Sequence, residues 1–248
     1  MKVKEYILER YRARKPMHMT LIDPAKQEVE RAASIAREAE RLGTDAIMVG
    51  GSTDVTQENL DSTVKAIKKA VSLPVIYFPS GAHAISPFTD AIYFMSMLNS
   101  RNLRMVIGEQ VMGAPIVAKL GLETISMGYV IVEPGMKVGE VGEANLVKRD
   151  DLQTAVAYGL AAQFMGMDLI YYEAGSGAPE PIPTEMVSAV KEKVRIPVVV
   201  GGGIRSARQA MSLRAAGADI IVTGTLVEGE GFSQSLEGVI RAVKDRSA

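Results

Sequence analysis

The sequence contains no cysteine and no tryptophan in its 248 residues, and only 2 histidines. Without cysteine, disulfide bonds, thiolate metal sites and cysteine nucleophiles are excluded. Neither His18 nor His83 has the second histidine that a zinc site would need, so structural roles are expected for both. These absences leave the compartment open, with a cytoplasmic location as the default expectation.

The chain also lacks a long hydrophobic run and an excess of charge of one sign. The most apolar stretch, residues 105–120, is interrupted by glycines, a glutamate and a proline, and is too short to span a bilayer. The first residues, MKVKEYILERYRARK, are too charged for a signal peptide, so none is expected. The 28 basic residues nearly balance the 29 acidic ones, and no long basic patch indicates a nucleic-acid partner.

What the chain does contain is a regular alternation of short apolar runs and amphipathic segments. Hydrophobic residues make up 47% of it, enough for one large α/β domain or two small ones. Eight runs rich in β-branched residues predict strands at 17–23, 46–50, 75–79, 91–98, 125–135, 168–175, 197–203 and 219–224. Helical patterns follow at 27–42, 56–71, 103–120, 151–165, 184–194, 206–216 and 233–246.

Strands that alternate with helices predict a parallel sheet, and eight such units predict a single (β/α)₈ TIM-barrel domain over residues 1–248. An open doubly wound sheet is the alternative. It would more often carry a G-x-G-x-x-G turn after the first strand, where this chain has LIDPAK. The third unit is expected to be degenerate, because residues 80–90, SGAHAISPFTD, are unsuited to a crossover helix. The segment is either a trimmed loop or an opening in the barrel wall.

Residue types at the predicted helix ends agree with these boundaries. Ser206 and Thr184 stand where N-caps are needed. Glycines that can adopt a left-handed conformation stand just after four helical segments, at Gly43, Gly121, Gly166 and Gly217.

Three glycine-rich turns predict a phosphate site at the carboxyl ends of the strands. Gly202 and Gly203 follow the seventh strand, Gly224 and Thr225 follow the eighth, and Gly175-Ser176-Gly177 follows the sixth. Barrels commonly bind phosphate after the seventh and eighth strands, where backbone N–H groups approach the anion closely. The alternative is that these glycines only permit tight turns.

Two carboxylates are expected at the same end of the barrel. Strand alternation places Asp23 on the face of Met19 and Leu21, and Glu173 on the face of Tyr171. Asp23 and Ser52 could provide oxygen ligands for magnesium, although Asp23 could instead cap the next helix. Glu173 could act as a general base beside the phosphate, or be a structural acid. Since the sixth strand ends in a glutamate, the Schiff-base lysine of many aldolase barrels is missing there.

Taken in order, LIDPAK, VGGST, FPS, MSMLNSRN, GYVIVEPGMKVG, YYEAGSGAP, VGGGIRS and TGTLVE resemble the geranylgeranylglyceryl phosphate synthase family, which makes archaeal ether lipids. The resemblance covers nearly the whole chain, and the EAGSG form resembles the second subgroup of that family. It implies a magnesium-dependent prenyltransferase, which joins sn-glycerol 1-phosphate to geranylgeranyl diphosphate and releases diphosphate.

The resemblance also implies the roles of individual residues. Asp23 and Ser52 would hold Mg²⁺, and Glu173 would take the hydroxyl proton. Glycerol phosphate would be bound by Tyr171, Tyr172, Glu173, Ala174, Gly175, Ser176, Gly177, Gly202, Gly203, Gly224 and Thr225. The apolar segments 103–120 and 151–165 make a homo-oligomer plausible. The lipid product suggests that the enzyme works close to a membrane surface.

Family members carry a tryptophan near the position of Met105, so the accepted prenyl length is open. Either another side chain such as Tyr93 or Tyr129 closes the apolar groove for the prenyl chain at a length of twenty carbons, which we favour, or longer diphosphates are accepted. Two other functions remain as alternatives. One is a different phosphate-binding barrel enzyme, such as an indole-glycerol-phosphate synthase or a phosphosugar isomerase. The other is a non-catalytic barrel that only binds a phosphorylated ligand.

Overall fold

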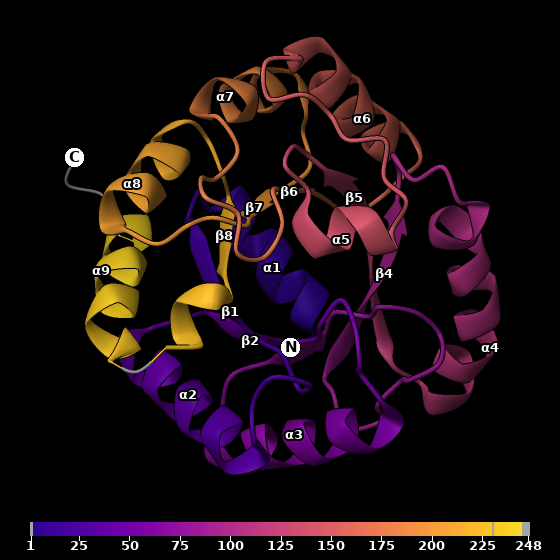
Figure 1. Ribbon diagram of the computed structural model, residues 1–248, viewed down its shortest axis with the longest axis vertical. Helices are drawn as coiled ribbons and strands as arrows, with labels where there is room; N and C mark the ends of the chain where they lie inside the picture. The colour runs from indigo at the N-terminus through magenta and orange to yellow at the C-terminus, as the bar shows by residue number, and fades with distance from the viewer. Residues whose placement is uncertain (1, 230, 245–248) are drawn as a thin grey trace.

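The computed structural model describes residues 2–229 and 231–244. In this part of the chain, eight parallel strands form a closed barrel in sequence order, with β8 paired to β1 (Figure 1). The strands are β1 (Met17–Ile22), β2 (Ala46–Val49), β3 (Val75–Tyr77), β4 (Ala91–Met97), β5 (Glu123–Ile131), β6 (Leu169–Glu173), β7 (Val198–Gly201) and β8 (Ile220–Thr223). The predicted parallel barrel is confirmed, and the open doubly wound sheet is excluded because β1 and β8 pair directly.

Helices surround the barrel at the predicted places (Figure 1). They are α2 (Val29–Leu42), α3 (Gln57–Ala70), α4 (Glu109–Leu120), α6 (Leu152–Phe164), α7 (Thr184–Lys193), α8 (Ala207–Ala215) and α9 (Phe232–Lys244). The last two residues of the predicted helix 233–246 lie outside the described residues. The predicted helix 103–120 is divided, because a π-helical turn, η1 (Arg104–Gly108), precedes α4. None of these helices, nor any other in the described residues, is long and apolar enough to cross a membrane.

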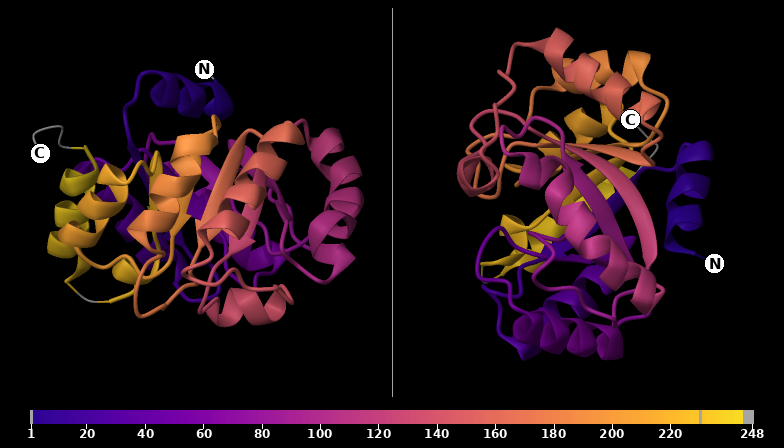
Figure 2. Two further views of the ribbon diagram at one scale, coloured as in Figure 1. Left: turned by 90° about the horizontal axis from the view of Figure 1, so that it is seen from above. Right: turned by 90° about the vertical axis from the view of Figure 1, so that its right-hand side faces the viewer.

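Three further elements were not predicted: α1 (Val3–Arg12), α5 (Met136–Val141) and a 3₁₀ turn, η2 (Thr225–Val227). Helix α1 closes the amino-terminal end of the barrel, where Val3 and Ile7 are buried in the barrel core. The N–H groups of Val3 and Lys4 donate to the Glu123 carboxylate at 2.8 and 2.9 Å, which anchors the helix start to β5. Figure 2 shows α1 and α5 on opposite sides of the barrel. Helix α5 follows the carboxyl end of β5, so it marks the end of the barrel where the predicted site residues lie.

Alternate residues of each strand face the barrel interior or the helices. The interior is rich in methionine and tyrosine, including Met17, Met19, Met48, Tyr93, Met127, Tyr129 and Tyr171. His18 points the other way, and its two ring nitrogens lie 2.9 Å from the Thr44 hydroxyl and 3.0 Å from the Thr223 hydroxyl, which agrees with the structural role expected for it. Burial, with a smaller effect of Lys244, lowers the pKa of His18 to about 3, so the ring is neutral at physiological pH.

The barrel wall is incomplete between β3 and β4. Only Ile76 and Tyr77 of β3 pair with β4, opposite Ala91 and Ile92, whereas β4 continues to Met97 and pairs with β5 over its whole length. Residues 78–90, all of which the structure describes, contain turns but no helix. Neither strand pairing nor a crossover helix therefore seals the upper part of this seam.

The helix ends support one of the two predicted N-caps. Ser206 caps α8, and its hydroxyl and the Gln209 side chain form a reciprocal capping box. The prediction for Thr184 was wrong: Pro183 is the N-cap of α7, and the hydroxyl of Thr184 donates to Glu185 instead. All four predicted end glycines have positive φ, between 64° and 110°.

Candidate active site

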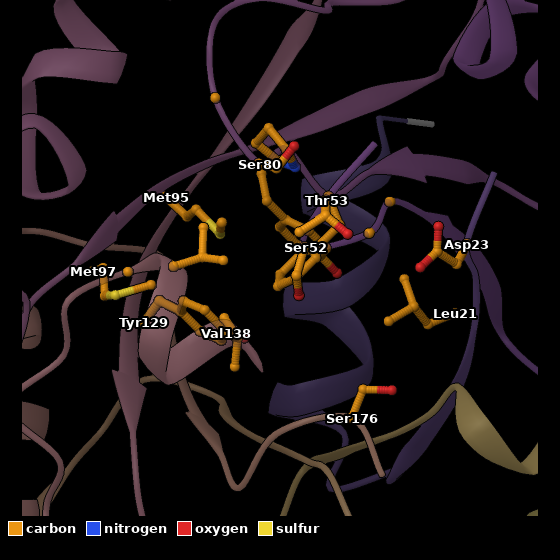
Figure 3. Close-up of a pocket in the computed structure, with 18 of the residues that line it drawn as sticks. Leu21, Asp23, Ser52, Thr53, Ser80, Met95, Met97, Tyr129, Val138 and Ser176 are labelled. Atoms are coloured by element: carbon orange, nitrogen blue, oxygen red, sulfur yellow. The ribbon is translucent and has the colours of Figure 1, made fainter. Parts of the chain in front are cut away.

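A cavity of about 240 Å³ opens at the carboxyl ends of the strands. Residues from several βα loops and strand ends line it, among them Asp23, Ser52, Ser80, Met97, Glu173, Ser176 and Gly224. In Figure 3, Met95, Met97, Tyr129 and Val138 lie at one side, Asp23 lies at the opposite side next to Leu21, and Ser52 and Thr53 lie between them. One space therefore has a polar side suited to an anion with a cation, and an apolar side suited to a hydrocarbon chain.

Asp23 lines this cavity and does not cap the next helix. Helix α2 starts at Val29, with Glu28 in the N-cap position. The Oδ1 atom of Asp23 accepts a hydrogen bond of 3.0 Å from the Ala25 N–H, which fixes the carboxylate. Its close neighbour is the backbone of Gly51, where a Cβ atom would lie 2.4 Å from Oδ1. Gly51, the second glycine of VGGST and the neighbour of Ser52 in the chain, therefore leaves the space that the Asp23 carboxylate occupies.

Burial raises the pKa of Asp23, against the lowering effects of the Ala25 hydrogen bond and of Lys26. The negative charges of Glu228 and Asp54 raise it further. A carboxylate that is poorly solvated and close to other acids is stabilised by a bound cation. Among the described residues there is no cluster of three or more His, Cys, Asp or Glu that could hold a metal by itself. One carboxylate with a hydroxyl fits Mg²⁺, which takes few protein ligands and keeps water or phosphate oxygens.

Glu173 ends β6 inside the barrel and is only 7% exposed. Its Oε1 atom accepts a hydrogen bond of 2.7 Å from the Gly175 N–H, and the Tyr171 hydroxyl donates to the same carboxylate. Burial raises the pKa of Glu173 although both hydrogen bonds act to lower it. The carboxylate is thus a stronger base than a solvated glutamate, which suits proton abstraction near neutral pH.

Two glycines of β7 and its loop make room for these groups. A Cβ atom on Gly201 would lie 2.0 Å from the Tyr171 hydroxyl oxygen, and one on Gly202 would lie 2.3 Å from Oε1 of Glu173. No other residue type leaves that space without displacing the acid. The glycine run VGGG therefore does more than permit a tight turn.

A smaller cavity of about 40 Å³ lies beside Glu173 and shares Leu21, Glu173, Ser176 and Gly224 with the larger one. It is lined by Leu21, Tyr171, Glu173, Ser176, Gly202, Gly203, Ile204, Arg205, Val222, Thr223, Gly224 and Thr225. The hydroxyls of Ser176 and Thr225 are 3.0 Å apart, and the Gly177 N–H donates to the Thr225 hydroxyl at 3.1 Å. The three predicted glycine-rich turns thus meet around one small space, which we call the phosphate cup.

Four residues of the predicted acceptor site line neither cavity, and two of them, Tyr172 and Ala174, lie in the outer layer. The Tyr172 side chain lies in the outer layer, where its hydroxyl donates to the Ala155 carbonyl at 2.6 Å. Ala174 is fully buried in that layer, and its N–H donates to Gly201. Both follow from strand alternation, which turns every second residue of YYEA toward the helices. Of this segment, Tyr171, Glu173 and Ser176 line a cavity, whereas Gly175 and Gly177 line neither and donate their N–H groups to Glu173 and Thr225.

The apolar side of the larger cavity passes through the incomplete seam between β3 and β4. Its lining combines barrel-interior residues such as Tyr93 and Tyr129 with outer-layer residues such as Ile85, Ile92 and Val117. Met105 of η1 and Gly113 of α4 also line it, and α5 contributes Val138 and Val141. Residues of the segment 80–90 and Met105, near the start of the predicted helix 103–120, therefore border the same space.

Some lining residues were not predicted. Phe78 packs edge-on against Tyr93 and Tyr129, with ring centroids 6.1 and 5.5 Å apart, and forms an aromatic floor with them. Arg205 borders the phosphate cup, and Lys26 and Lys137 border the larger cavity. The only sequence signal for Arg205 was its position directly after the glycine run in VGGGIRS.

The chain matches the PcrB family over residues 9–246. It belongs to that family. The geranylgeranylglyceryl phosphate synthase of Picrophilus torridus is 51% identical to it over 98% of this chain and 100% of the relative. The Pyrococcus abyssi enzyme of the same name is 50% identical over 98% of both chains.

Solved structures of the family agree with this fold. The Thermoplasma acidophilum (S)-3-O-geranylgeranylglyceryl phosphate synthase, crystallised with its substrate sn-glycerol-1-phosphate, superimposes with a TM-score of 0.96 at 47% identity, covering 98% of this chain and 99% of that chain. A tryptophan synthase alpha chain from Legionella pneumophila, 14% identical with a TM-score of 0.66, shares the fold alone.

Proposed function

We propose that this PcrB-family protein transfers the geranylgeranyl group of geranylgeranyl diphosphate to the hydroxyl on carbon 3 of sn-glycerol 1-phosphate, as the name of the Thermoplasma acidophilum enzyme states for that relative. The observation that carries the proposal is the position of Glu173, a buried carboxylate between the phosphate cup and the cavity that contains Asp23 and Ser52. The acceptor oxygen forms a bond to carbon one of the prenyl chain. The bond from that carbon to diphosphate breaks, diphosphate leaves with the electron pair, and the hydroxyl proton passes to Glu173.

The phosphate cup would hold the acceptor. Its glycines at 202, 203 and 224 permit close approach of the phosphate to the backbone, and the hydroxyls of Ser176 and Thr225 can turn toward it. With its phosphate anchored there, the glycerol hydroxyl would lie beside Glu173 in the larger cavity. Holding acceptor and donor together in this way replaces a bimolecular encounter. This can lower the activation free energy by several kcal/mol, at best by roughly 7–11 kcal/mol.

Asp23 and Ser52 would hold Mg²⁺ together with the diphosphate. When bound there, the ion would neutralise the charge that develops on the departing diphosphate. Asp23 contributes a carboxylate already fixed by the Ala25 N–H, so little ordering is needed when the cation binds. Lys26, which pairs with Glu228 at 3.0 Å, adds a positive charge on the same side of the cavity.

The apolar arm would hold the prenyl chain. We interpret the seam between β3 and β4, with its missing helix, as the degenerate third unit that provides the opening. Ile85, Ile92, Val117 and Gly113 would contact the chain, and the rings of Phe78 and Tyr129 would lie under its reactive end. Aromatic faces stabilise positive charge, which develops at the allylic carbon as its bond to diphosphate breaks.

A homo-oligomer is part of the proposal. Leu103, Ile107 and Val111 stand four residues apart on η1 and α4, and Leu103 is 75% exposed. On α6, which follows α4 around the barrel, Phe164 is 79% exposed. Such apolar surface favours association with a second copy of the chain. Light scattering on the purified protein tests this, and a monomer that persists at high concentration would contradict it.

One assay tests the function against both alternatives. The protein is incubated with magnesium, sn-glycerol 1-phosphate and radiolabelled geranylgeranyl diphosphate, and the organic phase is analysed for a phosphate ester that carries the label. We expect the product only when both substrates and magnesium are present. A protein that binds glycerol phosphate but forms no product would favour a non-catalytic barrel. Turnover of a phosphosugar or an anthranilate-derived substrate instead would favour another barrel enzyme.

A further inference from the structure

The phosphate cup has one charged neighbour that the proposed reaction has not yet used. We propose that Arg205 binds the acceptor phosphate, and that its guanidinium supplies the positive charge that offsets the charge of the phosphate. The inference rests on the proposed function, since it takes the acceptor to lie in this cup. It concerns the affinity for the acceptor and assigns Arg205 no part in the chemical step.

A cation is needed because this cup contains an anion before the substrate arrives. Glu173 lines it, and a phosphate monoester would bring close to two further negative charges. Two N–H groups of the loop are already committed: Gly175 donates to Glu173, and Gly177 donates to Thr225. Arg205 carries the only positive charge among the twelve residues that line the cup, all of which the structure describes.

The Arg205 side chain is held in place without being neutralised. Its Nη1 atom donates to the Pro179 carbonyl at 3.2 Å, and its Nη2 atom donates to the Gly177 carbonyl at 3.0 Å. Carbonyl groups are uncharged, so these bonds orient the guanidinium and leave its charge available. A guanidinium has five N–H donors, so further donors remain for phosphate oxygens.

The other cations at this end of the barrel differ in this respect. Lys26 pairs with Glu228 at 3.0 Å, and Lys137 pairs with Glu140 at 3.1 Å. In the part of the chain that the structure describes, no carboxylate forms an ion pair with Arg205. Arg205 is therefore the cation at the cup whose charge is not offset by a protein acid.

The same contacts make Arg205 a brace for the wall of the cup. Residues 177–181 pass so close to the β7 turn that a Cβ atom on Gly203 would lie 2.4 Å from the Glu180 carbonyl carbon. Two substitutions separate the effect of the contacts with the Pro179 and Gly177 carbonyls from the effect of the charge. Arg205→Lys keeps the charge and loses the two-pronged contact, whereas Arg205→Gln loses the charge.

The experiment is calorimetric titration of sn-glycerol 1-phosphate, and separately of inorganic phosphate, into the wild type and three variants. We expect Arg205→Gln to weaken binding about tenfold or more, as for loss of a charge-assisted hydrogen bond, with a weaker salt dependence. Arg205→Lys should retain much of the affinity, because lysine still binds phosphate as a point charge. Arg208→Gln, which removes a charge from the first turn of α8, three residues after Arg205, without lining the cup, is the matched control and should bind as the wild type does.

The turnover of Arg205→Gln at saturating acceptor should stay near the wild-type value, and the acidic limb of its pH profile should not move. Unchanged affinity in a folded Arg205→Gln variant overturns the inference, and so does a shift of that limb, because the residue would then act on Glu173. If Arg205→Gln does not fold, Arg205→Lys decides: binding that no longer depends on salt overturns the inference. A folded wild type that binds no glycerol phosphate overturns the proposed function instead.

Discussion

The backbone N–H of Gly175 donates a hydrogen bond of 2.7 Å to Oε1 of Glu173. The carboxylate and the glycine-rich loop that follows it are therefore one structural unit. Gly175 has φ near 100°, and a Cβ atom there would lie 2.6 Å from the Gly135 carbonyl oxygen, so only glycine places this N–H correctly. The loop orients the acid on one side and forms the phosphate cup on the other.

Replacing Glu173 by glutamine should lower turnover by about 10²–10⁴-fold, because the amide keeps the shape but cannot accept the proton. Affinity for glycerol phosphate should change little. Steady-state kinetics and acceptor titration measure the two effects, with Glu185→Gln on the exposed start of α7 as the control. Turnover within about threefold of the wild type would show that Glu173 is only structural.

The same substitution should stabilise the folded protein at neutral pH. Burial raises the pKa of Glu173 above its ordinary value of 4.5, so the folded state favours the protonated acid. The stability that the wild type gains from binding this proton is fully present below the unfolded-state pKa and is lost as the pH rises through the folded-state pKa. In urea unfolding across this pH range, the free energy of unfolding of Glu173→Gln should increase relative to that of the wild type as the pH rises. A variant less stable than the wild type at pH 7 would contradict this.

Activity should be lost on the acidic side for the same reason. Proton abstraction needs the ionised Glu173, so the acidic limb of the turnover profile should lie above pH 4.5, in the direction of the raised pKa. Single-turnover rates at saturating substrates, measured over the stable pH range, give this limb. A limb at or below the ordinary glutamate pKa would argue for a solvated carboxylate as the base.

Replacing Asp23 by asparagine should remove most of the activity and raise the magnesium concentration needed for half-maximal rate, because the anionic ligand is lost. Acceptor binding should survive, since the phosphate cup lies on other loops. Asp54→Asn is the control for charge alone: Asp54 is exposed, lies in the same βα loop as Ser52 and raises the pKa of Asp23, but does not line the cavity. Normal turnover of Asp23→Asn at limiting magnesium would exclude the metal assignment.

The phosphate cup is best tested at Thr225. The substitution Thr225→Val keeps the shape but removes the hydroxyl that accepts from Gly177 and contacts Ser176, so acceptor affinity should fall several-fold. Gly203→Val is less informative because Gly203 has φ near 71° and a side chain there would displace Glu180 and Pro181. Titration of glycerol phosphate into folded Thr225→Val measures the change. Unchanged affinity would place the phosphate elsewhere.

Prenyl length should depend on Met105, which lines the apolar arm. The substitution Met105→Trp should fill part of the arm and shift selection further toward twenty-carbon over thirty-five-carbon diphosphate. Met112→Trp on the exposed face of α4 is the control and should not alter the ratio. Competition between the two diphosphates measures it. An unchanged ratio for Met105→Trp would show that the prenyl chain runs elsewhere.

The alternation of runs was enough to predict the parallel barrel, because strand and helix periods differ and each βα unit repeats the same order. It did not reveal α1 or α5. Helix α1 is charged on most of its surface, and its anchor is Glu123, which lies far away in the sequence. Helix α5 is only six residues long and lies over the barrel mouth, so it lacks the pattern of a helix packed on the sheet.

By itself, the sequence determined the barrel, the strand ends that carry Asp23, Ser52 and Glu173, and the three glycine-rich turns, because each depends on local spacing. Only the tertiary structure decided what those ends do together. Barrel closure brings the hydroxyls of Ser176 and Thr225 within 3.0 Å, strand alternation turns Tyr172 away, and only Ile76 and Tyr77 of β3 pair with β4. The tertiary structure also decides the position of the Arg205 guanidinium, since its carbonyl partners lie 26 and 28 residues away in the sequence. Contacts between distant segments depend on strand register and closure, which no local pattern of residues encodes.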